Sequence, residues 1–340
     1  MNIIITGGCG FVGSSLCLFL KKNFKNLNIL SIDNLSKNYS KFNEKILKKR
    51  GISNKNINIG KFNSLKKIKF KADFIIDCSA EPAVEVSRRK IVGVLESNFL
   101  STVNVLEKAK EDKSKVIFIS SSRAYPIETS YIKFKKYRRF KKHLAYSENL
   151  NFSGQKTIYG FTKYSSERLI EEYEYSEKIK YIINRCGLIT GPGQYGKVEQ
   201  GLVSLWMWRH INKIDLSYKG YDGKGVQVRD ILFIEDFCKL IFLQIKKFNI
   251  FENNLFCIGG GHKNTTDLRN LTKICERISK NKVKISQNLQ TSIYDIPYYV
   301  SSLKKIKKFC NWEPKIKLDD GLKDIYNWML KDKNKIKNFF

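Results

Sequence analysis

Short apolar runs alternate with stretches of helical apolar spacing through the first half of the chain. The run IIIT, residues 3–6, predicts a buried strand, and SSLCLFLKKN, residues 14–23, predicts a helix. Further strands are predicted for 27–33, 72–80, 115–122 and 180–190. Further helices are predicted for 95–111 and 159–175. Strands and helices that alternate in this way predict an α/β fold with a doubly wound parallel sheet.

The alternation breaks after about residue 190. The segments GPGQYGKVEQG and KGYDGKGVQVRD are rich in glycine and polar residues and predict loops, whereas ILFIEDFCKLIFLQI predicts a core strand and helix. We therefore expect two lobes, a larger one and a smaller, interleaved C-terminal one. The predicted boundaries are 1–187 plus about 228–258 for the larger lobe, and about 188–227 plus 259–335 for the smaller.

Composition narrows the class of protein. No apolar run approaches the roughly 20 residues of a membrane span, and the start, MNIIITGG, does not resemble a signal peptide. The eight cysteines are scattered, no Cys-x-x-Cys pair occurs, and there are only three histidines. This pattern argues against a metal site and a disulfide framework, and it favours a reduced, cytoplasmic protein.

The formal net charge is +31. Lysines are spread along the whole chain, so we interpret this charge as the ordinary use of lysine on the protein surface. No specific nucleic-acid partner is expected. The exception is YIKFKKYRRFKKH, residues 131–143, where aromatic residues alternate with basic ones. This run could bind nucleic acid or membrane phosphates, but a solvated loop or helix face is the favoured interpretation.

A glycine-rich turn follows the first predicted strand. In TGGCGFVG, residues 6–13, Gly7, Gly10 and Gly13 lie three positions apart. The first glycine permits a tight turn, the second lets the backbone approach a pyrophosphate, and the third allows close helix packing. A purely structural turn is the alternative, but a glycine triplet between a strand and a helix favours a Rossmann-type dinucleotide site.

Residues on either side of this turn complete the predicted cofactor site. Phe11 and Val12, at the end of the turn, are predicted to bind the cofactor, because the N–H groups and positive dipole end of the helix that follows favour a phosphate. Asp33, followed by Asn34, ends the second predicted strand about twenty residues further on. A carboxylate there accepts hydrogen bonds from the ribose hydroxyls and repels a 2′-phosphate, so the predicted cofactor is NAD rather than NADP.

A tyrosine precedes a lysine by four residues at three places, which puts both side chains on one face of a helix. The pairs are Tyr131 with Lys135, Tyr137 with Lys141, and Tyr159 with Lys163. A tyrosine hydroxyl with its free pKa of ~10 becomes a better base beside a lysine cation. We choose Tyr159 and Lys163, because their helix follows the strand KVIFISSS and the loop after it, and functional residues gather at the carboxyl ends of parallel strands.

These motifs together resemble the extended short-chain dehydrogenases/reductases that act on sugar nucleotides. The resemblance rests on TGGCGFVG, SSSRAYP and YGFTK and extends over nearly the whole chain. It implies that Ser121 is the catalytic hydroxyl and that Tyr159 is the base. Lys163 would assist the base and also hold the nicotinamide ribose.

The same resemblance implies further roles. Ala80, in CSAEP, would lie beside the cofactor phosphates, and Asn98 would support both the cofactor and the active-site helix. The implied substrate-binding residues are Ser122, Arg123, Gln200 and Arg229. For Arg229, a structural ion pair with Asp230 or Glu235 is the alternative to binding the nucleotide diphosphate. A homodimer through helices 95–111 and 159–178 is implied, although plain core packing explains their amphipathic pattern equally well.

Ser122 and Arg123 stand where dehydratases of the family carry an Asp-Glu pair, which argues against dehydration. The segments VEQGLVSLW, GKGVQVRD and INRCGLITGPGQYG resemble the CDP-paratose (CDP-tyvelose) 2-epimerase branch. This resemblance implies an isomerase of nucleotide-sugar metabolism and polysaccharide biosynthesis with tightly held NAD. A 4-epimerase or a reductase of a related sugar nucleotide is the first alternative, and a non-catalytic NAD-binding protein with a basic, polyanion-binding face is the second.

Three positions depart from the family pattern. Lys61 stands where an aspartate usually lies near the adenine, and Ser292 stands where an arginine usually contacts the substrate. Leu188 replaces an asparagine that is common after the active-site helix. The loss at position 292 weakens the predicted grip on a diphosphate.

Overall fold

The computed structural model forms two compact units. It describes residues 1–82, 89–140, 142, 144–197 and 200–340. The first unit consists of Met1–Ala124, Thr157–Arg185 and Cys238–Phe256, and the second of Tyr125–Lys156, Cys186–Phe237 and Cys257–Phe340. The assignment of a cofactor-binding domain and a substrate-binding lobe to stretches of the chain stays a prediction.

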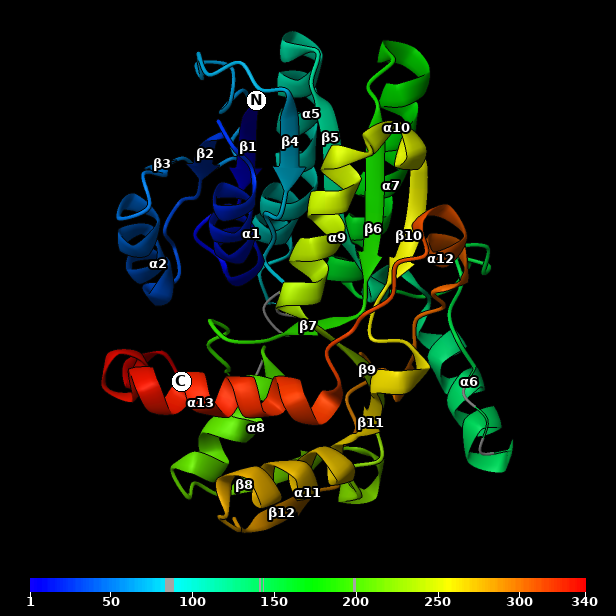
Figure 1. Ribbon diagram of the computed structural model, residues 1–340. Helices are drawn as coiled ribbons and strands as arrows, with labels where there is room; N and C mark the ends of the chain where they lie inside the picture. Colours follow the sequence, from blue (N-terminus) through cyan, green and yellow to red (C-terminus); the bar gives the residue numbers. More distant parts are fainter. Residues whose placement is uncertain (83–88, 141, 143, 198–199) are drawn as a thin grey trace. The chain divides into compact units, whose positions relative to one another are not determined.

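The first unit is built around a seven-stranded sheet with the order β10-β6-β5-β4-β1-β2-β3 (Figure 1). Its strands are β1 (Asn2–Thr6), β2 (Asn28–Ile32), β3 (Ser53–Lys55), β4 (Phe74–Asp77), β5 (Lys115–Ser121), β6 (Tyr181–Cys186) and β10 (Asn254–Ile258). The pairings of β1 with β2 and β4, of β2 with β3 and of β4 with β5 are parallel. The predicted α/β class with a parallel sheet is confirmed.

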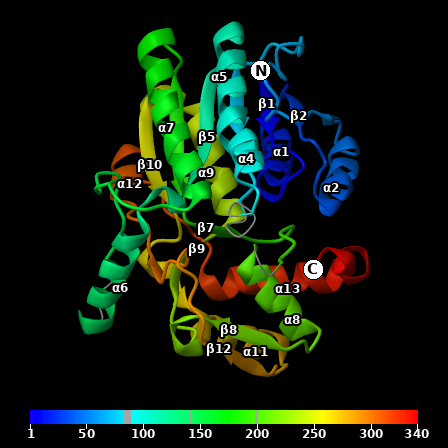
Figure 2. The ribbon, with the colours of Figure 1, turned by 180° about the vertical axis from the view of Figure 1, so that it is seen from behind.

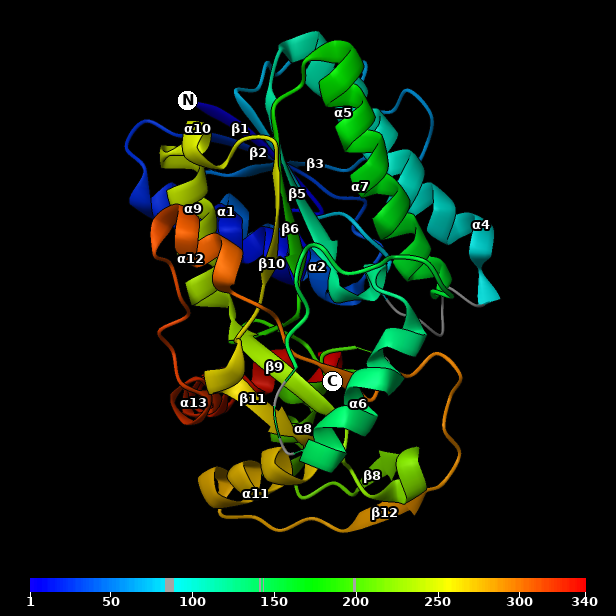
Figure 3. The ribbon, with the colours of Figure 1, turned by 90° about the vertical axis from the view of Figure 1, so that its right-hand side faces the viewer.

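Helices cover both faces of this sheet. They are α1 (Phe11–Asn23), α2 (Asn38–Lys48), α4 (Ile91–Val94), α5 (Ser101–Asp112), α7 (Ile158–Glu177), α9 (Ile234–Lys246) and α10 (Phe248–Phe251). Figure 2 shows α5 and α7 side by side, and in Figure 3 they lie on the opposite side of the strands from α1 and α9. The predicted helix at 95–111 differs in its first part, because Leu95–Leu100 forms a π-helical turn before α5.

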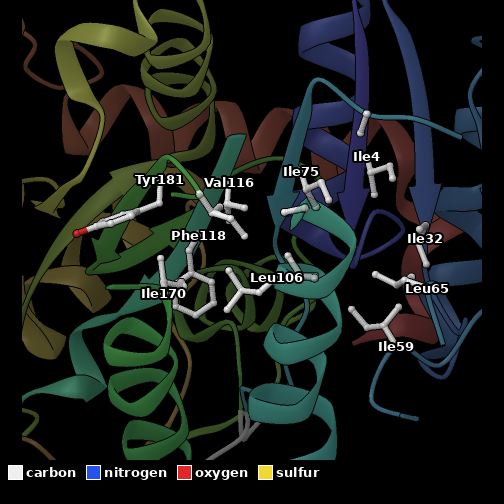
Figure 4. Packing of buried hydrophobic residues seen from close by; sticks show 14 of the residues in the cluster. Ile4, Ile32, Ile59, Leu65, Ile75, Leu106, Val116, Phe118, Ile170 and Tyr181 are labelled. Carbon is white, nitrogen blue, oxygen red and sulfur yellow. The ribbon is translucent and has the colours of Figure 1, made fainter. Parts of the chain in front are cut away.

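The apolar positions that predicted the sheet and its helices form its core. Phe118 on β5 and Ile170 on α7 are fully buried in one cluster with Leu106 on α5 (Figure 4). Ile4 and Ile75, on the neighbouring strands β1 and β4, extend this cluster across the sheet. Burying such side chains stabilises the fold by about 1.5–3 kcal/mol each.

The second unit contains a small mixed sheet in which β9 pairs with three other strands. Its strands are β7 (Leu188–Thr190), β9 (Val228–Phe233), β11 (Thr265–Asp267) and β13 (Tyr298–Tyr299), and β8 (Leu216–Lys219) pairs separately with β12 (Ile285–Asn288). Its helices are α6 (Ile127–Phe140), α8 (Leu202–Ile211), α11 (Leu268–Ser279), α12 (Lys304–Cys310) and α13 (Leu318–Ile336). Among the described residues, no helix is long and apolar enough to cross a membrane.

One predicted strand is wrong. The segment 180–190 was expected to be a single core strand, but it forms β6 and β7, which belong to different sheets. The chain changes sheets at Gly187, where a Cβ atom would lie 3.1 Å from Asp230 Oδ1 and 3.2 Å from Ser301 Oγ. A larger residue would therefore crowd this crossing point.

Candidate active site

The turn between β1 and α1 depends on its three glycines. Gly7 has a φ of +61°, and a Cβ atom there would lie 2.9 Å from Cys78 O. A Cβ on Gly13 would lie 2.2 Å from Gly7 O, so α1 begins pressed against the turn. Gly10 precedes the helix without a side-chain cap. The N–H groups of Phe11 and Val12 therefore have no acceptor within the helix and line its N-terminal end.

Asp33 lies beside this turn, directly after β2. Its Oδ2 accepts a hydrogen bond from Cys9 N at 3.1 Å, and its Oδ1 accepts one from Leu35 N at 2.8 Å. Burial raises the pKa of the carboxyl above its ordinary value, while these backbone N–H groups oppose the rise. Asn34 is exposed and accepts a hydrogen bond from Ser36 N at 3.1 Å. A partly buried carboxylate thus stands next to the glycine turn, and its role at a ribose site stays a prediction.

A buried carboxylate at the end of β4 shapes the turn that leads to Ala80. Asp77 Oδ1 accepts hydrogen bonds from Thr6 Oγ1 at 2.6 Å and from Ser79 at 3.1 Å (N) and 2.6 Å (Oγ). These bonds tie the ends of β1 and β4 together. Sequence reasoning missed Asp77, although an acidic residue inside an apolar strand was a visible signal.

Asn98 lies in the π-helical turn and connects two elements of the candidate site. Its Oδ1 accepts a hydrogen bond from Glu81 N at 2.7 Å, and its Nδ2 donates to Thr162 Oγ1 at 3.2 Å. Glu81 directly follows Ala80, and Thr162 is part of α7. The extra residue of a π-turn reorients a side chain, and such turns occur often at functional sites. Asn98 therefore holds the turn after β4 against α7.

The start of α7 packs closely on the chain that follows β5. A Cβ atom on Gly160 would lie 2.1 Å from Arg123 O, so only glycine permits this approach. Thr157 caps the helix by accepting a hydrogen bond from Gly160 N at 2.9 Å. Ser121 ends β5, and its Oγ accepts a hydrogen bond from Arg123 N at 3.2 Å. This packing brings the first turn of α7, which begins with Ile158 and Tyr159, to the end of β5.

Lys163, one turn further along α7, attaches the helix to β5 a second time. Its Nζ donates a hydrogen bond to Ile119 O at 3.0 Å and lies 4.5 Å from the centroid of the Phe118 ring. The lysine side chain is buried, and Tyr159 is only 8% exposed. A buried cation stabilises the anionic form of a tyrosine hydroxyl near it, because little water screens the attraction.

A buried polar network joins α7 to β5 and β6. The sequence analysis did not include it. Glu167 accepts a hydrogen bond from Ser120 Oγ at 2.5 Å and forms an ion pair with Arg185 on β6, whose Nε lies 3.0 Å from Glu167 Oε1. All three side chains are buried. Glu167 is four residues after Lys163 and so lies on the same helix face, which is the signal that could have revealed it.

The predicted substrate residues are divided between the units. Ser122 and Arg123 form a short 3₁₀ turn after β5, and Gln200 exchanges backbone hydrogen bonds with Lys197 in the second unit. Arg229 donates hydrogen bonds to the carbonyls of Val228, at 2.8 Å, and Ile296. Its ion pair, at 3.8 Å, is with Asp295 and not with Asp230 or Glu235.

Comparison with known proteins gives the family. Residues 3–259 match the NAD dependent epimerase/dehydratase family. This chain belongs to that family. It is 26% identical to the CDP-paratose 2-epimerase of Salmonella typhi, over 96% of this chain and 99% of the relative. It is also 26% identical to the UDP-glucuronate 4-epimerase of Thermodesulfobacterium geofontis, over 96% of this chain and 95% of that protein.

Solved structures of epimerases have the same fold. The UDP-glucuronic acid 4-epimerase from Bacillus cereus, in complex with UDP-glucuronic acid and NAD, superposes with a TM-score of 0.83. The two chains are 24% identical, and the match covers 97% of this chain and 99% of the other. The extended short-chain dehydrogenase/reductase resemblance and the Rossmann-like fold are thus confirmed.

The residues of the first unit suit NAD, the cofactor in the name of the family. The glycine turn leaves no room for a side chain at Gly7 or Gly13, and the start of α1 presents N–H groups to an anion. The Asp33 carboxylate stands next to this turn, and its negative charge would repel the 2′-phosphate of NADP. These features favour NAD, with Gly7, Gly10 and Asp33 as the residues that would hold it.

At two of the three positions that depart from the family pattern, the side chain contacts another residue of this chain. Lys61 is exposed and forms an ion pair with Glu96 at 3.4 Å. Ser292 Oγ accepts a hydrogen bond from Tyr294 N at 3.3 Å, so this position serves its own loop. Leu188 is the first residue of β7. Among the described residues, no group of histidine, cysteine or acidic side chains is arranged to hold a metal ion.

Proposed function

We propose that this chain is an NAD-dependent epimerase of a nucleotide-activated sugar, of the kind that CDP-paratose 2-epimerase represents. The observation that carries this proposal is the packing of α7 on the end of β5. There Gly160 contacts the backbone after Ser121, and the buried Lys163 bonds Ile119. This packing supports a base, a cation and a second hydroxyl at the carboxyl end of β5, one strand away from the strand that leads into the glycine turn.

In the proposed reaction, Tyr159 takes the proton of a sugar hydroxyl as that carbon becomes a ketone. Bound NAD supplies the hydride acceptor for the oxidation and the hydride donor for the return. The Ser121 hydroxyl donates a hydrogen bond to the reacting oxygen, and the Lys163 cation stabilises the phenolate. Once the ketone presents its other face, Tyr159 returns its proton to the oxygen, and the configuration is inverted with no net redox change.

The two residues after Ser121 argue against a dehydratase activity. Loss of water from a sugar needs an acid and a base beside the ring, and Ser122 and Arg123 offer no carboxylate there. A guanidinium suits an anionic substrate instead, because it binds phosphate or carboxylate through two parallel hydrogen bonds. Arg229 is the second candidate for the diphosphate, and it would exchange its ion pair with Asp295 for the ligand.

A 4-epimerase is the second candidate function. The similarity to the UDP-glucuronate 4-epimerase, which equals that to the 2-epimerase in percentage identity, supports it. The same residues would perform the same steps at another carbon. The two functions therefore differ in which sugar hydroxyl reaches Tyr159.

The first experiment is mass spectrometry of the compounds that acid releases from purified protein. We expect NAD, and a nucleotide sugar that carries over would identify the substrate class directly. Candidate CDP, UDP and dTDP sugars are then incubated with the enzyme in deuterated water and followed by NMR. Epimerisation by oxidation and return keeps the original hydrogen on the inverted carbon.

Two outcomes would contradict the proposal. Deuterium on the inverted carbon would show exchange with solvent and exclude the direct oxidation of that carbon. Consumption of added NADH in a one-to-one ratio with substrate would show a reductase. In both experiments, a protein with Tyr159→Phe serves as the control for contaminating enzymes.

A further inference from the structure

Helix α6, which Figure 3 shows in green, contains most of the basic run of the sequence, and six residues of this part of the run are exposed. We define the basic face of α6 by its exposed residues Ile132, Lys135, Lys136, Arg138, Arg139 and Phe140. The apolar members are 56% exposed at Ile132 and 62% exposed at Phe140. Helical spacing places Ile132, Lys136, Arg139 and Phe140 within one continuous strip.

The inner side of α6 is held firmly by the second unit. Phe134 is buried in a core cluster with Tyr298, and Ser130 both donates to Tyr298 O at 2.8 Å and accepts from Tyr298 N at 3.0 Å. Tyr131 OH lies 3.2 Å from Tyr221 OH, and the rings of Tyr137 and Tyr298 lie 5.3 Å apart. The basic face is therefore presented on a rigid element.

The described residues leave the charge of this face without neutralising ion pairs. The sequence of α6 contains five cations against one carboxylate, Glu128. Within the part of the chain that the structure describes, Lys135, Lys136, Arg138 and Arg139 form no ion pair. Lys133 differs, because its Nζ turns inward and donates to Ala145 O at 3.1 Å. Four exposed cations remain available to a partner.

We propose that the basic face of α6 docks on an anionic phospholipid membrane. The four exposed cations contact lipid phosphates, while Ile132 and Phe140 enter the boundary between headgroups and acyl chains. A nucleic acid suits the face less well. Its bases stack on exposed aromatic rings, but Tyr131 and Tyr137 face inward and Phe134 is buried, which leaves Phe140 as the one exposed ring of α6. Ile132 would find no apolar partner on a phosphate backbone.

The test is sedimentation of the full chain with vesicles. We expect binding to phosphatidylcholine vesicles that contain about 30% phosphatidylserine, and no binding to pure phosphatidylcholine. Raising the salt concentration from about 0.1 M to about 0.5 M should release most of the protein, because added ions screen the attraction.

Three variants locate the contact. Replacing Lys135, Lys136, Arg138 and Arg139 by glutamine should lower the partition coefficient about a hundredfold. The control replaces four other exposed cations of the same unit by glutamine, namely Lys304, Lys308, Lys323 and Lys331. It removes the same charge and should lower binding by less than about fivefold. The double variant Ile132→Ser with Phe140→Ser keeps every charge and should lower binding about tenfold.

Each result decides the proposal. An equal loss in the control would show that the overall charge attracts the membrane, and the assignment to α6 would be wrong. Binding of polyuridylate RNA without vesicle binding, unchanged by the Ile132 and Phe140 substitutions, would replace the lipid surface by a nucleic acid. Since all of these residues are exposed, circular dichroism should show the native fold in every variant.

Discussion

Helices α6 and α7 share a sequence pattern and differ in what surrounds it. Each contains a tyrosine followed four residues later by a lysine, Tyr131 with Lys135 and Tyr159 with Lys163. In α7 the lysine is buried, and its Nζ bonds Ile119 O. In α6 the corresponding lysine is exposed to water. The third pair, Tyr137 with Lys141, ends outside the described residues. Spacing therefore selects a helix face, and packing decides its chemistry.

The residue after the tyrosine shows how the two helices come to differ. Gly160 follows Tyr159 and lets α7 approach Arg123 O, whereas Ile132 follows Tyr131 and is exposed. A side chain at position 160 would hold the first turn of α7 away from β5. The comparison thus teaches that a tyrosine and lysine pair becomes a candidate for proton transfer where the backbone can come close enough to bury it.

The largest expected effect is on the tyrosine of α7. Tyr159→Phe removes the proposed base and should lower kcat about 10³-fold, without a change in fold. The matched variant Tyr131→Phe removes only the hydrogen bond with Tyr221 and should keep full activity. Both are measured by NMR turnover assays beside circular dichroism. If Tyr131→Phe inactivates the enzyme and Tyr159→Phe does not, the choice between the helices is wrong.

The second effect concerns the stability of α7 itself. Glu167→Gln leaves the buried Arg185 charge without its counter-ion and should lower the free energy of unfolding by about 3–5 kcal/mol. The control, Glu171→Gln, breaks a partly exposed pair with Arg168 on the same helix and should cost about 0.5 kcal/mol or less. Urea unfolding measures both. Equal losses would mean that the buried network does not anchor the helix.

Local patterns explain why much of the fold could be predicted. The strand, glycine turn, helix and Asp33 lie within the first 33 residues, and each depends on its sequence neighbours. The change of sheets at Gly187 could not be read in this way, because it is set by Asp230 and Ser301, which lie far along the chain. The π-helical turn before α5 likewise follows from contacts of Asn98 with Glu81 and Thr162.

The candidate site was predictable to a similar degree. The tyrosine and lysine of α7 have a recognisable spacing, whereas the partners of Glu167 come from two separate strands. The basic run was interpreted as a solvated loop or helix face, and within α6 its residues Lys135, Lys136, Arg138 and Arg139 are exposed whereas Phe134 is buried. Sequence alone did not show which of its residues turn inward, since Lys133 lies among the exposed cations.

The third effect tests the cation of α7. Lys163→Met keeps much of the side chain's volume but removes its charge, so the phenolate loses its electrostatic support and kcat should fall about a hundredfold. The same substitution at Lys135 should leave kcat unchanged. Steady-state kinetics at saturating substrate measure both. An intact kcat in Lys163→Met would show that the buried lysine only joins α7 to β5.

The smallest expected effect is a difference in the pH dependence of stability between variants at Lys133 and at Lys135, both in α6. Burial lowers the pKa of Lys133 below its ordinary value, and Lys136 adds to this through its charge. Between the lowered folded-state pKa and the ordinary pKa, the unfolded chain binds more protons, so stability rises with pH in this alkaline window. Below the window, where both states are charged, the cost of burying the charge is fully present.

The measurement is urea unfolding as a function of pH. As the pH rises through this window, the free energy of unfolding of the unsubstituted protein should rise relative to that of Lys133→Met. The difference between the unsubstituted protein and Lys135→Met should stay constant. The Lys133 Nζ contacts Ala145 O and lies 5.0 Å from the Tyr146 ring centroid, so part of its burial cost is already offset. Parallel pH profiles in both comparisons would mean that Lys133 is as well hydrated as its neighbours on the basic face.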